Sequence, residues 1–318
     1  MSFVALLLGL ALTVWLVSTA SMTAVVQSLA RIGWGAAVVV AVRAVMITIN
    51  GVGWSKLLGK LSNVPLRVFL LARWVREAVD DLLPAAYIGG GLVGARMLTL
   101  WRAPTAIAYA GTVADLFLQT VAQAFFALLG ACVLLRLIGP RAVLPGLILG
   151  VAITIIALGG FYAVQRHGGA RLIDRLFTAL SSRMTSGART KPGFHAAMQT
   201  VWNGRRSIIV ASTILHFLAW SFGTFEVWSA LYFMDWPATL ENAVIIESLG
   251  VSISIAAFVV PGSWGIQEAG YILIGQMLGL PIQISLTLSL IKRVPDFALG
   301  VPGLIVWHSI ESRRPRSK

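Results

Sequence analysis

The sequence predicts an all-α polytopic integral membrane protein, and three observations support this fold class. Mean hydropathy is +0.85, and 58% of the 318 residues are hydrophobic whereas only 12% are charged. Several apolar runs reach the length that an α-helix needs to cross about 30 Å of hydrocarbon. So much apolar surface exceeds what a soluble core could bury. A membrane β-barrel is not expected either, because its strands would show alternating patterns of about ten residues.

Six apolar runs are long enough to cross the bilayer, and two further segments are apolar but interrupted. The six runs lie near residues 2–19, 34–53, 105–136, 143–165, 207–233 and 282–309. The first run lacks a preceding basic region and is longer than the apolar part of a secretory signal, so we expect an uncleaved span. The interrupted segments are 77–102 and 242–280. We expect about six full transmembrane helices plus two re-entrant hairpins.

Lysine and arginine indicate the orientation, because they concentrate in cytoplasmic loops. Residues 166–206 hold eight basic residues against one acid, residues 54–76 hold five basic residues, and the C-terminal tail is basic. Residues 233–241 hold two acids and no basic residue. We therefore expect the 166–206 loop and the C-terminus in the cytoplasm of a bacterial cell, with the chain in the inner membrane.

This orientation requires each interrupted segment to enter and leave the membrane from one side. Segment 77–102 is too short for two spans. Segment 242–280 is long enough for either a re-entrant hairpin or two full spans, and two full spans would bring the total to eight. Both alternatives satisfy the charge pattern.

Charge and cysteine content exclude several classes of function. The formal net charge is +13, but the basic residues cluster beside apolar spans, so we interpret them as topology signals and lipid contacts rather than a nucleic-acid surface. Cys132 is the only cysteine, which excludes an internal disulfide and a cysteine metal site. No glycine-rich phosphate loop or HExxH motif is present. We expect no metal, no cofactor and no enzymatic activity.

The two interrupted segments resemble each other. In each, a proline follows two apolar residues, an aromatic residue comes three positions later, and glycines follow. The break residues are Pro84, Gly89, Gly90, Pro261, Gly262 and Gly265. Because the segments would enter from opposite sides, we expect an inverted repeat within one transmembrane domain over 1–318, with halves near 1–140 and 141–318. Chance convergence of two proline–glycine breaks is the alternative.

Broken helices inside a membrane favour a binding cavity. Proline removes a backbone N–H and glycine relaxes the backbone. The freed polar groups must then be buried in protein or line a wet cavity. Helix N-termini exposed in this way suit an anionic ligand such as a phosphate. We therefore expect the partner to present an anionic or polar group to this cavity.

Polar and ionisable side chains in the apolar segments are the candidate cavity residues, because a charge at the bilayer centre costs about 2.5–3.5 kcal/mol. Two helical stripes are expected, one of Thr112, Asp115, Gln119 and Gln123, the other of Ser285, Ser289, Lys292 or Arg293, and Asp296. The substrate-cavity candidates are Glu268, Gln267, Arg96, Asp115, Gln119, Lys292, Arg293, Asp296 and Glu247.

Several of these residues have a purely structural alternative. Lys292 and Asp296 are spaced as an i,i+4 pair that would only permit insertion. Arg96 and Glu268 hold comparable places after the two breaks, so they would either touch substrate or pair with each other. His216 lies in an apolar run without a clustered partner, and we expect it to be a packed histidine rather than a ligand or a proton relay.

A charged group precedes the first break. It comprises Arg73, Arg76, Glu77, Asp80 and Asp81. Arg73–Glu77 and Arg76–Asp80 are i,i+4 pairs. We expect this group at the cytoplasmic mouth of the cavity, and a local salt-bridge patch without a role in binding is the alternative.

Two stretches of sequence resemble a known family. PGSWGIQEAGYILIGQMLGLP, followed by LSLIKRVPDFALGVPGL, is similar to the lysylphosphatidylglycerol synthase transmembrane-region family, and the matching positions are Pro261, Gly262, Gly265, Gln267, Glu268 and Arg293. WVREAVDDLLPAAYIGGGLVGAR looks like the first broken segment of that family. The resemblance is closest to the branch of hopanoid-biosynthesis-associated membrane proteins. It covers nearly the whole chain, most specifically 74–117 and 245–303.

The resemblance implies a flippase-like fold with re-entrant helices. In two-domain relatives this region is held to move an aminoacylated phospholipid between leaflets. We expect no separate aminoacyl-transferase domain in this protein and therefore no lysyl transfer. The family often has arginine directly before the glutamate, where this chain has Gln267. We expect a lipid translocase whose cargo is a hopanoid or another polar lipid. The alternative is a non-transporting membrane scaffold that organises lipid-biosynthesis enzymes.

Overall fold

The computed structural model describes residues 11–12, 22–83, 89–167, 193–237, 239–256 and 263–313, and its secondary structure there is entirely helical. The helices are α2 (Met22–Ile32), α3 (Gly35–Ser62), α4 (Leu66–Leu82), α5 (Gly89–Leu100), α6 (Thr105–Ile138), α7 (Pro140–His167), α9 (Phe194–Trp202), α10 (Arg206–Phe222), α11 (Thr224–Phe233), α12 (Leu240–Ala256), α13 (Ile266–Met277), α14 (Ile282–Ile291) and α15 (Val294–Ser312).

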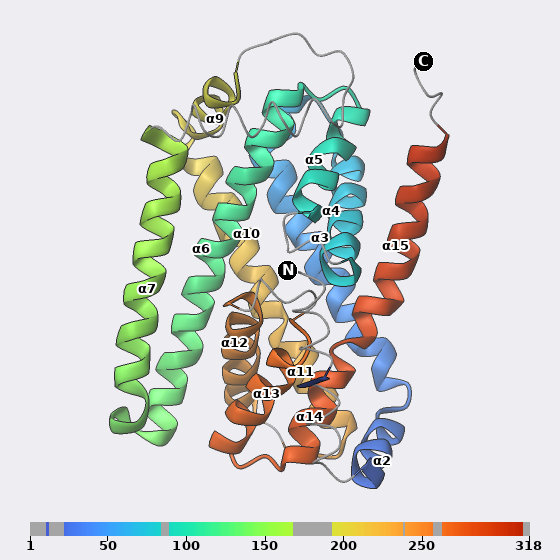
Figure 1. Ribbon diagram of the computed structural model, residues 1–318, viewed down its shortest axis with the longest axis vertical. Coiled ribbons are helices and arrows are strands. Elements are labelled where there is room, and N and C mark those ends of the chain that lie inside the picture. Colours follow the sequence, from blue (N-terminus) through green and yellow to red (C-terminus); the bar gives the residue numbers. More distant parts are fainter. Residues whose placement is uncertain are drawn as a thin grey trace.

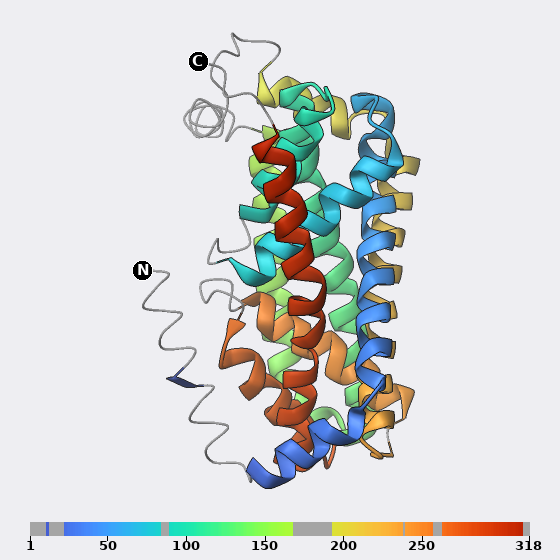
Figure 2. The same ribbon diagram turned by 90° about the vertical axis from the view of Figure 1, so that its right-hand side faces the viewer.

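The helices form an elongated bundle whose long axis is followed by α3, α6, α7 and α10 (Figure 1). Helices α4, α5 and α9 occupy one end, together with the C-terminal end of α15. Helices α2, α11, α13 and α14 gather at the opposite end, and the view turned by 90° shows the same division (Figure 2). The two interrupted segments therefore approach the middle of the bundle from opposite ends.

Three stretches are long and apolar enough to cross a membrane, by the length and composition of the described residues. They are Gly35–Ser62, Thr105–Ile138 and Arg206–Phe233. These three confirm the runs expected near 34–53, 105–136 and 207–233. The 143–165 run lies within α7, which exposes Ile148, Ile155 and Ile156 on its outer surface. The run at 2–19 lies almost wholly outside the described residues.

Each interrupted segment forms two short helices that pack against each other. Helices α4 and α12 have 17 residues each, and α5 and α13 have 12 each. Helices α4 and α13 have both ends described, and at 1.5 Å per residue they reach about 25 Å and 18 Å, which is less than about 30 Å of hydrocarbon. The breaks themselves, 84–88 and 257–262, lie outside the described residues, and with them Pro84, Pro261 and Gly262.

The glycines expected at the first break belong instead to a helix. Gly89 and Gly90 form the first turn of α5. A Cβ at Gly90 would collide with the Arg76 carbonyl and the Asp80 carboxylate of α4. These glycines therefore serve the close packing of α5 on α4. At the second break Gly265 does have a left-handed φ of 77°, as expected for a glycine at a helix start that needs this conformation.

The last apolar run, expected as one helix over 282–309, is two helices. Helix α14 ends at Ile291, α15 begins at Val294, and Lys292 and Arg293 lie between them. Pro295 stands in the first turn of α15. Because proline lacks the N–H that would bond to the carbonyl four residues earlier, it ends α14 and is well tolerated at the start of α15.

The apolar core is divided along the bundle, and the division positions the site. One cluster surrounds Trp54 and Phe69 and the other surrounds Val39 and Ile245. On α3, Val39 belongs to one cluster and Trp54 to the other, and the polar side chains of Arg43 and Asn50 lie between them. A polar layer thus separates two apolar ones.

Candidate functional site

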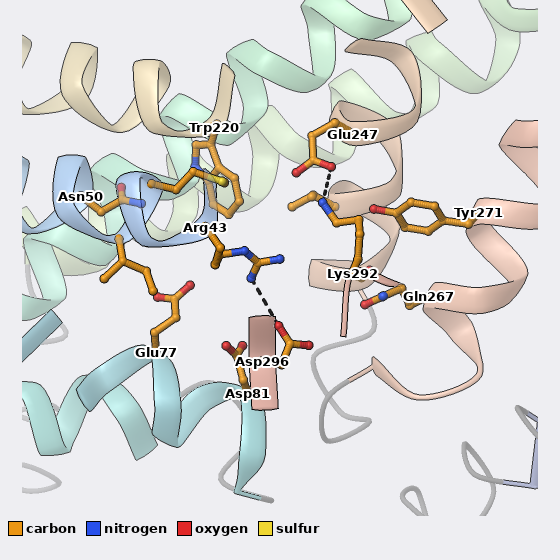
Figure 3. A pocket seen from close by; sticks show the side chains of 14 residues that line it. Arg43, Asn50, Glu77, Asp81, Trp220, Glu247, Gln267, Tyr271, Lys292 and Asp296 are labelled. Carbon is orange, nitrogen blue, oxygen red and sulfur yellow. Dashed lines mark hydrogen bonds and ion pairs between the residues drawn. The ribbon is translucent and has the colours of Figure 1, made fainter. Parts of the chain in front are cut away.

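A cavity of about 120 Å³ lies in this polar layer, where both interrupted segments meet α3 and α15 (Figure 3). It is lined by side chains from α3, α4, α10, α12, α13, α15 and the α14–α15 junction. These are Arg43, Met46, Ile47, Asn50, Glu77, Asp81, Trp220, Glu247, Val251, Ser254, Gln267, Tyr271, Lys292 and Asp296.

Arg43 holds three helices together at the cavity wall. Its Nη2 and Nε donate to the Glu226 carboxylate of α11 at 2.9 and 3.2 Å. Its Nη1 donates to Asp296 Oδ1 of α15 at 3.4 Å. Glu226 is fully buried and Arg43 is 16% exposed. This bidentate geometry is one that an arginine provides and a lysine does not.

Lys292 bridges two buried carboxylates. Its Nζ forms an ion pair with Glu247 of α12 and lies 3.5 Å from Glu226 Oε2. The local Lys292–Asp296 pair is not formed. Because the helix breaks at the α14–α15 junction, Lys292 points toward α12 and pairs with Glu247, while Asp296 pairs with Arg43. The sequence-based alternative of a self-neutralised pair is wrong.

Glu268 supports the site rather than lining it. Its Oε2 accepts a hydrogen bond from the Gly265 backbone N–H at 2.6 Å, and its Oε1 accepts from Arg293 at 2.8–2.9 Å. The Arg293 guanidinium lies 3.8 Å from the ring centroid of Trp264. Glu268 is fully buried, whereas its neighbour Gln267 faces the cavity. Arg293 and Glu268 thus fix the start of α13 against the α14–α15 junction.

A second buried network lies beside the cavity, around Asp115. Asp115 accepts from Arg76 Nη1 at 2.8 Å and from Gln119 Nε2 at 2.6 Å. The His216 ring lies 3.0 Å from its other carboxylate oxygen and 2.7 Å from Asn50 Oδ1. The expected stripe on α6 is confirmed, since Thr112, Asp115, Gln119 and Gln123 are all buried. His216 is fully buried, as a packed histidine would be, but it has two polar partners where none was expected.

Arg96 does not line the cavity. It pairs with Glu311 of α15 at 2.6 Å, without contact to Glu268. The Arg96–Glu268 pairing, one of the two alternatives for these residues, is therefore not formed.

The charged group before the first break is more buried than we expect for side chains at the cytoplasmic mouth of a cavity. Arg73 and Arg76 are 4% and 2% exposed. The Arg73–Glu77 pair is confirmed at 2.6 Å, whereas Arg76 lies 4.0 Å from Asp80 and bonds chiefly to Asp115. Asp80 accepts instead from the Gly90 N–H at 3.0 Å. Glu77 and Asp81 line the cavity itself.

Sequence reasoning did not select Arg43, Asn50 or Tyr271 for the cavity. Arg43 is the one charged residue in the apolar run at 34–53, and that isolation was a usable signal. Its partners are 183 and 253 residues away, so helical spacing could not reveal them. Among the described residues, no group of three or more metal-ligating side chains is present.

The bundle and its charged interior cavity are those of a multi-pass membrane protein. The chain belongs to the lysylphosphatidylglycerol synthase TM region family, whose profile matches residues 2–303. No curated protein and no solved structure matches the chain significantly. The family assignment agrees with the resemblance carried by the two broken segments, and it gives no support to a particular branch.

Proposed function

We propose that the protein is a lipid translocase of the bacterial inner membrane with its C-terminus in the cytoplasm. A lipid head group enters the cavity while its tails stay in the bilayer. The observation that supports this proposal is the cavity lining, which brings six charged side chains into the interior of an apolar bundle. Charges at this depth are costly and typically mark the path of a polar passenger.

The size of the cavity favours a head group as the occupant. The cavity of about 120 Å³ has room for several waters or for a small polar group. A whole lipid does not fit, so its chains remain in the membrane.

The charge of the cavity favours a head group that carries a positive charge. Four carboxylates and two cationic groups line it, which disfavours a purely anionic ligand. Arg43 and Lys292 are also engaged by buried acids and are not free to receive a phosphate. A hopanoid cargo is supported by the resemblance of residues 74–117 and 245–303 alone, and an amine-bearing hopanoid would suit the lining.

We further propose that α4–α5 and α12–α13 are re-entrant hairpins related as an inverted repeat. Both hairpins lead through a proline N-cap, Pro104 or Pro281, into the next helix. Such repeats bring broken helices together at the binding site of many transporters. The proposal includes no aminoacyl-transfer activity.

The test is lipid movement in proteoliposomes that contain acyl-labelled phosphatidylethanolamine, phosphatidylglycerol or hopanoid. Val251→Phe fills the cavity, whereas Val210→Phe makes the same change on the outer face of α10, where Val210 is 55% exposed. We expect movement by the wild type and by Val210→Phe, with at least a tenfold loss in Val251→Phe. Equal rates in all three would contradict a passage through this cavity, and no movement of any lipid would favour the scaffold alternative.

A further inference from the structure

The cavity holds more acids than bases once the local pairs are removed. Glu77 is neutralised by Arg73 at 2.6 Å. The two remaining cations, Arg43 and Lys292, are faced by four carboxylates. These are Asp81, Glu226, Glu247 and Asp296.

Asp81 is the acid without a partner. No hydrogen bond or ion pair to its side chain is formed within the described part of the chain, although it lines the cavity with Asp296 (Figure 3). The charged groups that face it are Arg43 from α3, Asp296 from α15, and Glu77 and Asp80 from its own helix. Glu77 is offset by Arg73, and Arg43 gives its two shorter bonds to Glu226. A negative charge at Asp81 beside Asp296 is therefore poorly compensated.

Asp296 is only partly compensated as well. Arg43 contacts it at 3.4 Å while giving its two shorter bonds to Glu226. Lys292 and Arg293 are its other cationic neighbours, and both are bound to other acids, Glu247 and Glu268.

An excess of carboxylates in a low-dielectric interior must be relieved by a bound cation or by protons. Two neighbouring acids in such a site share protons as a pair rather than titrating independently. The cavity is wide enough for either a water-borne proton or an ammonium group.

We propose that Asp81 and Asp296 form a proton-binding pair, and that a proton and a cationic lipid head group compete for it, so that lipid movement is coupled to proton movement in the opposite direction. This inference rests on the proposed translocase function and supplies its driving force.

The exchange conserves charge at every step. When an ammonium group enters, a carboxylic acid of the pair releases its proton to water and the resulting carboxylate accepts hydrogen bonds from the ammonium. When the ammonium leaves on the other side, the carboxylate takes up a proton there. One positive charge replaces another, so the interior never carries the full negative excess.

The first test measures proton release on ligand binding. Purified protein in weakly buffered detergent with a pH-sensitive dye receives short-chain phosphatidylethanolamine, or short-chain phosphatidylglycerol as the anionic control. We expect proton release with the amine lipid only, and an apparent affinity that falls as the pH is lowered, by at most roughly tenfold for each pH unit when one proton competes, since the two ligands are linked. No binding of the amine lipid, or an affinity independent of pH, would overturn the exchange.

Variants assign the effect to the pair. Asp81→Asn should abolish proton release, and Asp81→Glu should restore it. The matched control is Glu241→Gln, which neutralises an exposed acid at the start of α12 and should behave as the wild type. Proton release that persists in Asp81→Asn would exclude Asp81. If Asp81→Asn does not fold, two other results test the proton-binding role of Asp81. These are the pH dependence of binding by the wild type and proton release by Asp81→Glu.

The same proteoliposomes separate this inference from the proposed function. Lipid movement that a transmembrane pH difference accelerates in one orientation and slows in the other supports the coupling. Lipid movement insensitive to that difference leaves the translocase standing and overturns the proton exchange. Proton release without movement of any lipid overturns the translocase and, with it, the coupling.

Discussion

Among single residues, Asp115 has the most demanding position. It is fully buried on α6 and bonds to Arg76 of α4, to Gln119 of its own helix and to His216 of α10. A carboxylate in an apolar interior is tolerated when its charge and its hydrogen-bonding capacity are both satisfied. Asp115 therefore joins α4, α6 and α10 beside the cavity without lining it.

Replacement of Asp115 by asparagine should destabilise the fold. The change leaves the Arg76 charge buried without its main counter-charge, which costs about 3–5 kcal/mol. We expect a clearly lower midpoint of thermal unfolding in detergent. Asp235→Asn is the control, because Asp235 is exposed with a φ of 56°, a conformation that asparagine also accepts. An unchanged midpoint for Asp115→Asn would mean that the Arg76–Asp115 pair contributes little.

At the scale of helices, the two expected polar stripes had different outcomes for a physical reason. The stripe on α6 was predictable because α6 is one uninterrupted helix of 34 residues, so a spacing of three or four keeps side chains on one face. The stripe that includes Lys292 and Asp296 was not predictable, because Pro295 interrupts the helix there and the two side chains no longer lie on one helical face. A helical pattern predicts contacts only where the helix continues.

The start of α13 gives a test at the same scale. Glu268 satisfies the Gly265 N–H and the Arg293 guanidinium together, so Glu268→Ala removes a helix cap and a buried counter-charge at once. We expect amide hydrogen exchange over residues 265–269 to rise by roughly a hundredfold, which corresponds to about 3 kcal/mol. Glu241→Gln should leave this segment unchanged. Unaltered exchange in Glu268→Ala would show that packing alone holds the start of α13.

For the whole molecule, the sequence predicted which segments would meet but not how their charges would pair. Apolar runs and the distribution of arginine and lysine can be read directly along the sequence. They were enough to predict the helical fold class and the approach of the two interrupted segments from opposite ends. The pairs Arg43–Glu226 and Lys292–Glu247 join distant helices. Such pairs depend on the packing of the complete bundle, which no local spacing encodes.

The relation of the two hairpins to the bilayer is the property on which the proposed mechanism depends most. If both are re-entrant, the end of α4 and the start of α13 lie near the middle of the membrane. If each were two full spans, Leu83 would reach the outer surface and Trp264 the cytoplasmic surface. The lengths of α4 and α13, about 25 Å and 18 Å, favour the re-entrant arrangement.

Single cysteines placed in a Cys132→Ser background can decide between these arrangements. We expect an impermeant maleimide to label Pro237→Cys from outside and Asn203→Cys from the cytoplasmic side, since both positions are exposed and lie in loops at opposite ends. Leu83→Cys and Trp264→Cys should resist the reagent from both sides and react only after denaturation in detergent. Labelling of Leu83→Cys from outside, or of Trp264→Cys from the cytoplasm, would make that hairpin a pair of spans. The cavity would then no longer lie where two half-membrane hairpins meet, and an inverted repeat could not account for its position.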